Sequence, residues 1–245
     1  VNITLDTTPP TGTISGQPTS PTNSTSATLT VSGTNLVAYK YKLDNGIYSP
    51  GEILISTQNQ IILSSLSEGT HTVSIIGRDA LGNWQAEGSA TTATWVIDVT
   101  PPTAEVSGAP ASPTNSTGAA ITVGGTDVVA YKYKRDNEGS YSAEVPVATQ
   151  INLSLAEGDH IVYVIGKDSA GNWQAELNAS TAAWTIDTTP PAVAINAVTT
   201  PTNSSNQAIT GTRESGATIS VSVNTTATVG TVTYPNATTW SCAIS

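Results

Sequence analysis

Phenylalanine and methionine are absent from the 245 residues, and cysteine occurs only once, at position 242. A single cysteine excludes a disulfide within this chain. Without Phe and Met, a core must be built mostly from Val, Ile, Leu and Ala, residue types that suit thin, half-buried β-sheets. Hydrophobic residues still reach 38% of the chain, which is enough to argue against wholesale disorder.

Basic residues are also scarce, with eight Lys and Arg against eighteen Asp and Glu, a formal net charge of −10. Binding to nucleic acid needs a basic footprint for the phosphates, so this composition argues against a nucleic-acid partner. Attraction to an anionic membrane surface is disfavoured for the same reason. No hydrophobic run reaches the length of a membrane-spanning helix, so we expect no membrane insertion.

What the sequence does contain is an internal repeat. Its copies are Asp-Thr-Thr-Pro-Pro at 6–10 and 187–191, with Asp-Val-Thr-Pro-Pro at 98–102; Pro-Thr-Asn-Ser at 21–24, 113–116 and 201–204; Val-Ala-Tyr-Lys-Tyr-Lys at 37–42 and 129–134; and a Gly-Asn-Trp-Gln motif that closes 79–85 and 168–174. The period is about 90 residues, the size of one small β-sandwich domain.

The apolar residues inside each repeat alternate with polar ones. Ala27, Leu29 and Val31 are separated by Thr residues, and 119–123 repeats the pattern. Short alternating segments separated by Gly, Pro and Asn predict an all-β sandwich. Since no window has a helical period with a cap, we expect essentially no helix.

The repeat predicts four parts: 1–6 as the last strand of a preceding repeat, 7–98 as repeat 1, 99–187 as repeat 2, and 188–245 as a divergent, incomplete repeat 3. The chain starts at Val1 rather than Met, which indicates processing or a piece of a longer chain. The two ends out of phase with the repeat have two explanations. One is truncation of a longer array, and the other is donation of Val1–Asp6 to the third repeat of an identical subunit, which would build an open fibre.

The Asp-Thr-Thr-Pro-Pro linker, the Tyr-x-Tyr-x-x-Asp strand and the Glu-Gly-Thr-His…Asp-x-x-Gly-Asn ending resemble the immunoglobulin-like repeats of large secreted bacterial surface proteins. The resemblance covers nearly the whole chain and is weakest in the third repeat. It implies tandem immunoglobulin-like, seven-stranded Greek-key sandwiches, with an incomplete third domain. It also implies a location outside the cell or on its surface, and a spacer, adhesive or fibre-forming role beside neighbouring repeats or identical subunits.

Strands of such a sandwich run alternately up and down, so the preceding linker and two of the loops lie at the same end of each domain. Side chains with oxygen atoms are expected to gather there: Asp6, Asn35, Asp79 and Asn83 in repeat 1, and Asp98, Asp127, Asp168 and Asn172 in repeat 2. Convergent carboxylate and amide oxygens suit Ca²⁺, and the repeats that this chain resembles use linker and loop acids for calcium. The alternative is that Asp98 and Asp168 cap turns by accepting backbone N–H groups.

Trp84 and Trp173 are the candidate ligand-binding residues, because an exposed ring after Gly-Asn could stack on a sugar of a surface glycan. The alternative is that each ring packs on its own sandwich or a neighbouring domain. His71 and His160 occupy the same strand position, and no third polar partner is evident beside them, which argues against a metal or catalytic role.

Enzyme motifs are missing: neither Gly-x-Ser-x-Gly nor a phosphate-binding loop occurs. We therefore interpret the chain as a structural extracellular protein and not an enzyme. It would be a stalk or filament subunit for surface display, adhesion or fibre formation, with prolines that stiffen its linkers. The alternative is a glycan-binding or accessory module of a larger secreted protein. Exposed Trp84 and Trp173 in a groove would favour that alternative, and buried rings would favour the stalk.

Overall fold

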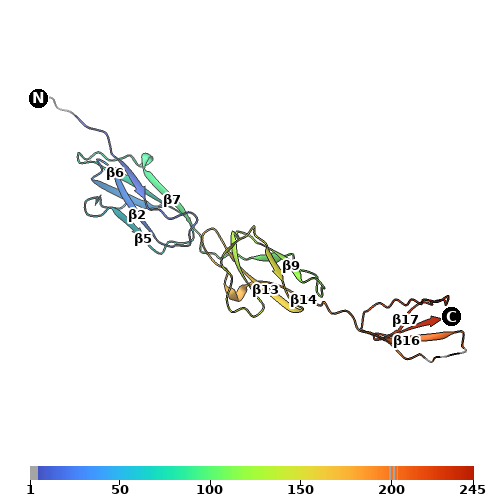
Figure 1. The fold of residues 1–245 in the computed structure, drawn as a ribbon. Helices are drawn as coiled ribbons and strands as arrows, with labels where there is room; N and C mark the ends of the chain where they lie inside the picture. The colour runs from blue at the N-terminus through green and yellow to red at the C-terminus, as the bar shows by residue number, and fades with distance from the viewer. Residues whose placement is uncertain (1–4, 199, 201, 203) are drawn as a thin grey trace. The chain divides into compact units, whose positions relative to one another are not determined.

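The computed structural model describes residues 5–198, 200, 202 and 204–245, so most of the strand predicted at 1–6 lies outside the described residues. The chain divides into two compact units, Val1–Ile186 and Asp187–Ser245 (Figure 1). The first unit holds two sandwiches of seven strands each, and the second holds one four-stranded sheet. The described strand ladders are antiparallel, and the helical segments among the described residues are two 3-10 turns. The prediction of tandem β-sandwiches is thus confirmed.

Each sandwich pairs a three-stranded sheet with a four-stranded one. In repeat 1 the sheets are β1-β2-β5 and β4-β3-β6-β7, from β1 Thr11–Ser15, β2 Ala27–Thr34, β3 Ala38–Leu43, β4 Ile53–Leu54, β5 Gln60–Leu63, β6 Gly69–Arg78 and β7 Thr91–Ile97. In repeat 2 they are β8-β9-β12 and β11-β10-β13-β14, from β8 Glu105–Ser107, β9 Gly118–Gly124, β10 Ala130–Arg135, β11 Val145–Pro146, β12 Ile151–Ser154, β13 Gly158–Lys167 and β14 Ser180–Ile186. The 3-10 turns η1 Glu87–Ser89 and η2 Glu176–Asn178 precede β7 and β14.

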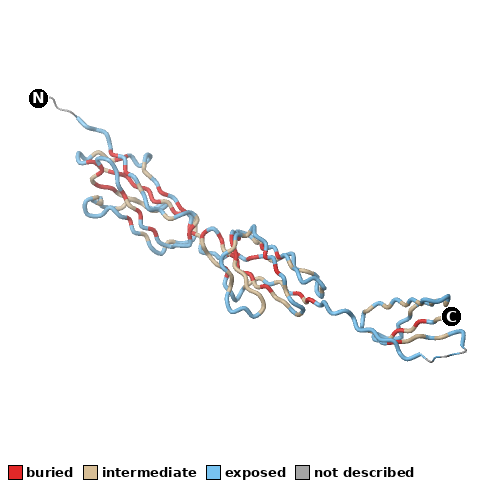
Figure 2. Tube along the Cα trace, in the orientation of Figure 1, coloured by how far each residue is buried: buried red, intermediate tan, exposed pale blue. Residues whose placement is uncertain are grey.

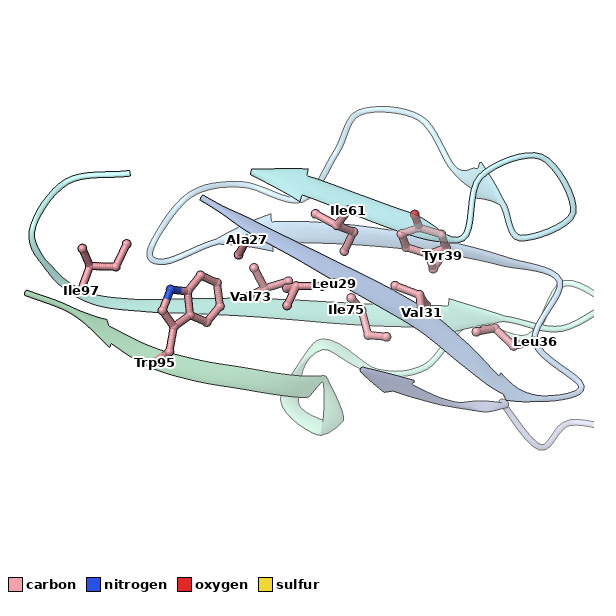
Figure 3. Packing of buried hydrophobic residues seen from close by; sticks show 10 residues of the cluster. All are labelled: Ala27, Leu29, Val31, Leu36, Tyr39, Ile61, Val73, Ile75, Trp95 and Ile97. Atoms are coloured by element: carbon pink, nitrogen blue, oxygen red, sulfur yellow. The ribbon is translucent and has the colours of Figure 1, made fainter. Parts of the chain in front are cut away.

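The core of each sandwich lies between its two sheets, as the buried stretches in Figure 2 show. In repeat 1, Leu29 and Val31 of β2 point inward with Tyr39 of β3 and Trp95 of β7, and all four are fully buried (Figure 3). Burial of each such side chain contributes about 1.5–3 kcal/mol, which is why alternate positions along a strand must be apolar.

The two repeats also share their strand register. His71 lies opposite Trp95 in the β6–β7 pair, and His160 lies opposite Trp184 in the β13–β14 pair. Equivalent residues of the two sandwiches therefore have equivalent neighbours, so that a structural role found in one repeat can be checked in the other.

The second unit is a single sheet in the order β15-β16-β18-β17, from β15 Val193–Ile195, β16 Gln207–Arg213, β17 Thr233–Asn236 and β18 Thr239–Ile244. Trp240 and Cys242 of β18 are buried, whereas Val193 and Ile195 of β15 are 59% and 68% exposed. Residues 217–223 keep an alternating apolar pattern but belong to no strand. The described residues of this unit thus provide one sheet where the first two repeats have two.

Candidate functional site

The loop between β6 and β7 is built around the carboxylate of Asp79. Its Oδ1 accepts the backbone N–H groups of Leu81 (2.9 Å) and Asn83 (2.8 Å), and its Oδ2 accepts Nδ2 of Asn83 (2.8 Å). The Asn83 side chain, helped by the backbone N–H groups and opposed by burial, holds the pKa of the Asp79 carboxyl below its ordinary value. Gly82 closes this turn at a φ of 93°, a conformation that favours glycine.

The same turn recurs in repeat 2. Asp168 Oδ1 accepts the N–H groups of Gly171 and Asn172, each at 2.8 Å, and its Oδ2 accepts Nδ2 of Asn172 at 2.9 Å. These are the hydrogen bonds expected of an aspartate that caps a turn. The two loop aspartates of the predicted calcium sites therefore already have N–H partners in both repeats.

The asparagine of each motif also binds the linker that enters its own domain. Nδ2 of Asn83 donates to the backbone oxygen of Asp6 (3.1 Å), and Nδ2 of Asn172 donates to that of Asp98 (2.8 Å). The linker aspartates in turn cap the next residues, since Asp98 Oδ1 accepts the N–H of Thr100 at 3.0 Å. Each linker is thus tied to the sandwich that follows it.

The final glutamine of each motif is buried and hydrogen-bonded to the backbone of other segments. Gln174, 5% exposed, accepts the N–H groups of Gly166 (3.1 Å) and Ala104 (2.9 Å) and donates to the oxygen of Asn178 (2.6 Å). Gln85 makes the corresponding bonds to Gly77 and Ser89 in repeat 1. Buried amide groups without such partners would be costly, so this position needs a glutamine for folding alone.

Trp84 and Trp173 are half-buried, and their rings lie beside cations on the outer face of the four-stranded sheet. Trp84 forms an isolated bridge with Arg78, which places both side chains on the same face, and Nζ of Lys40 lies 5.2 Å from the ring centroid. Trp173 is bridged to Lys167 and has Nζ of Lys132 at 4.6 Å. The rings are therefore neither buried in the core nor freely exposed, and they pack with lysine and arginine side chains.

The structure brings the predicted oxygen-bearing residues together at one end of each sandwich. Asp6, Asn35 and Asp79 line one groove in repeat 1, and Asp98, Asp127 and Asp168 line one in repeat 2. Asn35 and Asp127 have φ values of 57° and 61°, so both are left-handed turn residues.

The side chains that line these grooves are not arranged to coordinate a calcium ion. Within the described residues, no three His, Cys, Asp or Glu side chains are placed to hold a metal ion together. Asn83 and Asn172 direct their NH₂ groups, not their oxygens, to the aspartates. Calcium prefers six to eight oxygen ligands, so the donor set does not fit the ion as the side chains stand. The calcium site stays a prediction, to be tested by titration.

Two histidine sites were missed by the sequence reasoning, which expected no recurring polar partner. Nδ1 of His71 lies 2.9 Å from Oδ2 of Asp44, and Nε2 lies 2.8 Å from the backbone oxygen of Ser67. His160 has the same arrangement with Asp136 (3.0 Å) and the oxygen of Ala156 (2.9 Å). That expectation was wrong. The available signal was the aspartate that ends the repeated Tyr-x-Tyr-x-x-Asp pattern.

Both ring nitrogens of each histidine face an oxygen that can only accept a hydrogen bond, so this geometry favours the doubly protonated imidazole over the neutral one. The backbone oxygen of Ser67, with Asp44, raises the pKa of His71. Asp136, with the oxygen of Ala156, raises the pKa of His160. Burial by itself lowers the pKa of each histidine, but the hydrogen bonds outweigh it and the pKa stays raised.

No family model and no curated protein sequence matches the chain. Solved structures with similar folds include fibronectin(III)-like modules of CbhA from Clostridium thermocellum, at 11% identity and a TM-score of 0.41, covering 71% of this chain and 94% of that one. A tetra-tandem repeat in the extending region of a large adhesion protein has 20% identity and a TM-score of 0.30, covering 83% and 56%. A two-domain fibronectin type III segment of chicken tenascin has 17% identity and a TM-score of 0.27, covering 73% and 99%.

These similarities are too low to carry an argument about function. The description of the chain as tandem immunoglobulin- or fibronectin-III-like sandwiches rests on its own strand order and register. Among the described residues, no helix has the length and hydrophobicity that a membrane crossing requires.

Proposed function

We propose that the chain is a structural array of β-sandwiches that acts outside a bacterial cell as a spacer, stalk or filament subunit for display, adhesion or fibre formation. The observation that carries this proposal is the hydrogen bond from Asn172 to the linker oxygen of Asp98, repeated by Asn83 and Asp6. The repeated motif at 79–85 and 168–174 thus stabilises a loop of each domain and also holds the linker that enters that domain.

The prolines also stiffen the linkers. The second proline of the first two pairs, Pro10 and Pro102, is buried, so these two linkers are docked against the sandwiches that follow them, whereas Pro191 of the third pair is exposed. Proline also fixes φ near −65°, which removes backbone conformations that a flexible linker would sample. A linker that is both hydrogen-bonded and restricted in φ suits a part whose task is reach and stiffness.

A catalytic role has little support. His71 and His160 are the only two histidines, and both ring nitrogens of each are engaged by fixed oxygen atoms. A general base must reach and accept a proton from the reacting group, and neither imidazole has a ring nitrogen left open for that contact. We therefore propose a non-enzymatic protein.

Small-angle X-ray scattering of the whole chain tests the spacer proposal. Asn172→Ala removes the linker bond, and Asn178→Ala removes an exposed asparagine of η2 as a matched control. We expect Asn172→Ala to raise the flexibility seen in the scattering profile while the control matches the wild type. Equal profiles for all three proteins would contradict a stiffening role. Antibody labelling of intact source cells tests the extracellular location.

A second candidate function, glycan binding, is favoured by one observation. Four lysine side chains on the four-stranded sheets of repeats 1 and 2 lie over aromatic rings and have no carboxylate within ion-pair distance among the described residues: Lys40, Lys42, Lys132 and Lys134.

A further inference from the structure

The positive charge of this acidic chain is concentrated on two surfaces. Six of its eight basic residues lie on the outer faces of the four-stranded sheets, where they alternate along the strands with core residues such as Tyr39: Lys40, Lys42 and Arg78 in repeat 1, and Lys132, Lys134 and Lys167 in repeat 2. The whole chain has a net charge of −10, but this distribution makes the charge on each sheet face positive.

The lysines on these faces are held over aromatic rings. In repeat 1, Nζ of Lys40 is 5.2 Å from the Trp84 centroid and Nζ of Lys42 is 5.0 Å from that of Tyr48. In repeat 2, Lys132 lies over Trp173 at 4.6 Å and Lys134 over Tyr141 at 4.8 Å. We call each set of two lysines and two rings a lysine–aromatic row. Such contacts restrict the long lysine side chains, which lowers the entropy lost when a ligand binds.

The row lysines are free of acidic partners. Arg78 is paired with Glu52 at 2.7 Å, and Lys167 with Glu144 at 2.9 Å. In the part of the chain that the structure describes, no carboxylate lies within ion-pair distance of Lys40, Lys42, Lys132 or Lys134. These four ammonium groups are therefore available to an anion from solution.

Other acids near the rows do not cancel this charge. Glu87 and Glu176 are close enough to Tyr48 and Tyr141 to reinforce the rise that burial causes in the tyrosine pKa values. In repeat 1, Glu52 and Glu87 stand against the three cations of the face, and in repeat 2, Glu144 and Glu176 do. Each face therefore keeps an excess of positive charge at the row. Screening limits the repulsion from more distant acids, because charges more than about 8–10 Å apart interact weakly at physiological salt.

We propose that the lysine–aromatic rows bind an anionic polysaccharide. The two lysines of a row are two residues apart on one strand, so their backbone positions are spaced by about 7 Å, and the row is repeated in the second sandwich. A polymer that carries carboxylates at regular intervals fits repeated, pre-positioned point charges of this kind. The proposal rests on the glycan-binding candidate and names its residues and the class of glycan. It is independent of the spacer proposal, which does not involve the rows.

Nucleic acid is the other extended polyanion, and two observations disfavour it. Single strands gain much of their affinity from bases that stack on open aromatic rings, whereas here ammonium groups lie over Trp84 and Trp173. Double strands need a wide basic surface, and each face has only three cations. A nucleic-acid ligand is therefore an outcome that the experiment must separate from the polysaccharide.

Isothermal titration of the full chain with polygalacturonate at low salt tests the proposal, with the fully methyl-esterified polymer as an uncharged control of the same backbone. We expect the charged polymer to bind, the esterified polymer to give no signal, and binding to disappear at high salt. Equal binding of both polymers, or no binding of polygalacturonate at low salt, would overturn the proposal and leave the spacer proposal untouched.

A pair of variants in one strand locates the site. Lys132→Gln removes a row lysine, and Arg135→Gln removes the same charge from a residue already paired with Glu138 at 2.7 Å. We expect Lys132→Gln to weaken binding about threefold to fivefold, as for an exposed ion pair, and Arg135→Gln to have no effect. Equal losses in the two variants would refute the row as the site. Tighter binding of a single-stranded oligonucleotide than of polygalacturonate would also refute the assignment.

Discussion

The two histidine–aspartate pairs predict that the sandwiches are most stable in mildly acidic solution. His71 is 6% exposed, and its two ring nitrogens donate to Asp44 and to the backbone oxygen of Ser67. Loss of one proton leaves a ring nitrogen facing an oxygen with no hydrogen between them. The second repeat has the same pair in His160 and Asp136, with Asp159 adding to the negative field.

The direction of the pH dependence follows from the shifts in pKa. The pKa of both histidines is raised above the ordinary 6.5, so their contribution is fully present below that pH and is lost as the pH rises through the folded-state value. Burial would raise the pKa of Asp44, but hydrogen bonds from Thr72 and His71 outweigh it and lower the value below 3.8. The aspartate contribution is therefore present above pH 3.8 and is lost as the pH falls through the folded-state pKa. Maximum stability is expected between the two, near pH 5.

The magnitude is modest because the pairs are partly open to solvent. A hydrogen bond to a charged group contributes about 1.5–3 kcal/mol when buried. The Asp44 side chain is 39% exposed, and solvent screening reduces the expected contribution to about 1 kcal/mol per sandwich. For a domain of this size, that free energy of unfolding corresponds to about 4–8 °C in melting temperature.

Calorimetric melts of the full chain at pH 5.5 and 8.5 measure this effect, with the double variant His71→Gln/His160→Gln as the comparison. We expect the wild type to melt lower at pH 8.5 and the variant to lose most of the difference. Because the chain has only two histidines, their imidazole signals in NMR are directly assignable by these variants. A wild type with equal melting temperatures at the two pH values, or a variant that keeps the difference, would refute the reasoning.

Three further predictions follow from buried or hydrogen-bonded groups. Cys242, 1% exposed, should react slowly with a thiol reagent in the native chain and fast in denaturant; rapid native labelling would contradict its burial. Gln174→Ala should lower the free energy of unfolding of repeat 2 by about 2 kcal/mol in urea titrations, since two N–H groups lose their acceptor, while exposed Gln150→Ala should have little effect. Calcium should not change the melting temperature, because the oxygens of Asp168 already accept N–H groups; a rise in calcium that chelator reverses would establish a site.

Much of the fold was predictable because its signals are local. The alternation of Leu29 and Val31 with threonine indicates which side of β2 faces the core, whatever strand lies beside it. The shared register of the two repeats then follows from the repetition of those local patterns. The third unit was harder to predict, since 217–223 has the same alternation but no strand pairing among the described residues.

The histidine pairs escaped prediction because they depend on contacts between distant parts of the chain. His71 and Asp44 are 27 positions apart, and they meet only because β3 and β6 pair with Leu43 opposite Val73. A one-residue change in that register would move one partner to the other face of the sheet. Sequence reasoning that located both strands without their register could not place the two side chains together.

The loop motif and the lysine–aromatic rows are both repeated, but folding accounts only for the first. In the motif, the carboxylate of Asp168 and the amides of Asn172 and Gln174 are hydrogen-bonded within the sandwich. A residue that cannot make these bonds would leave a buried or partly buried donor or acceptor unsatisfied.

No such requirement applies to the row lysines. A cation–π contact open to solvent contributes only about 0.5–1 kcal/mol, which other side chains able to cover the ring could also provide. Yet Lys132 and Lys134 repeat the positions of Lys40 and Lys42 in a chain with only eight basic residues, and none of the four has an acidic partner in the described structure. Since stability explains the rings but not the unpaired charges above them, the charges are better explained by an anion that binds there.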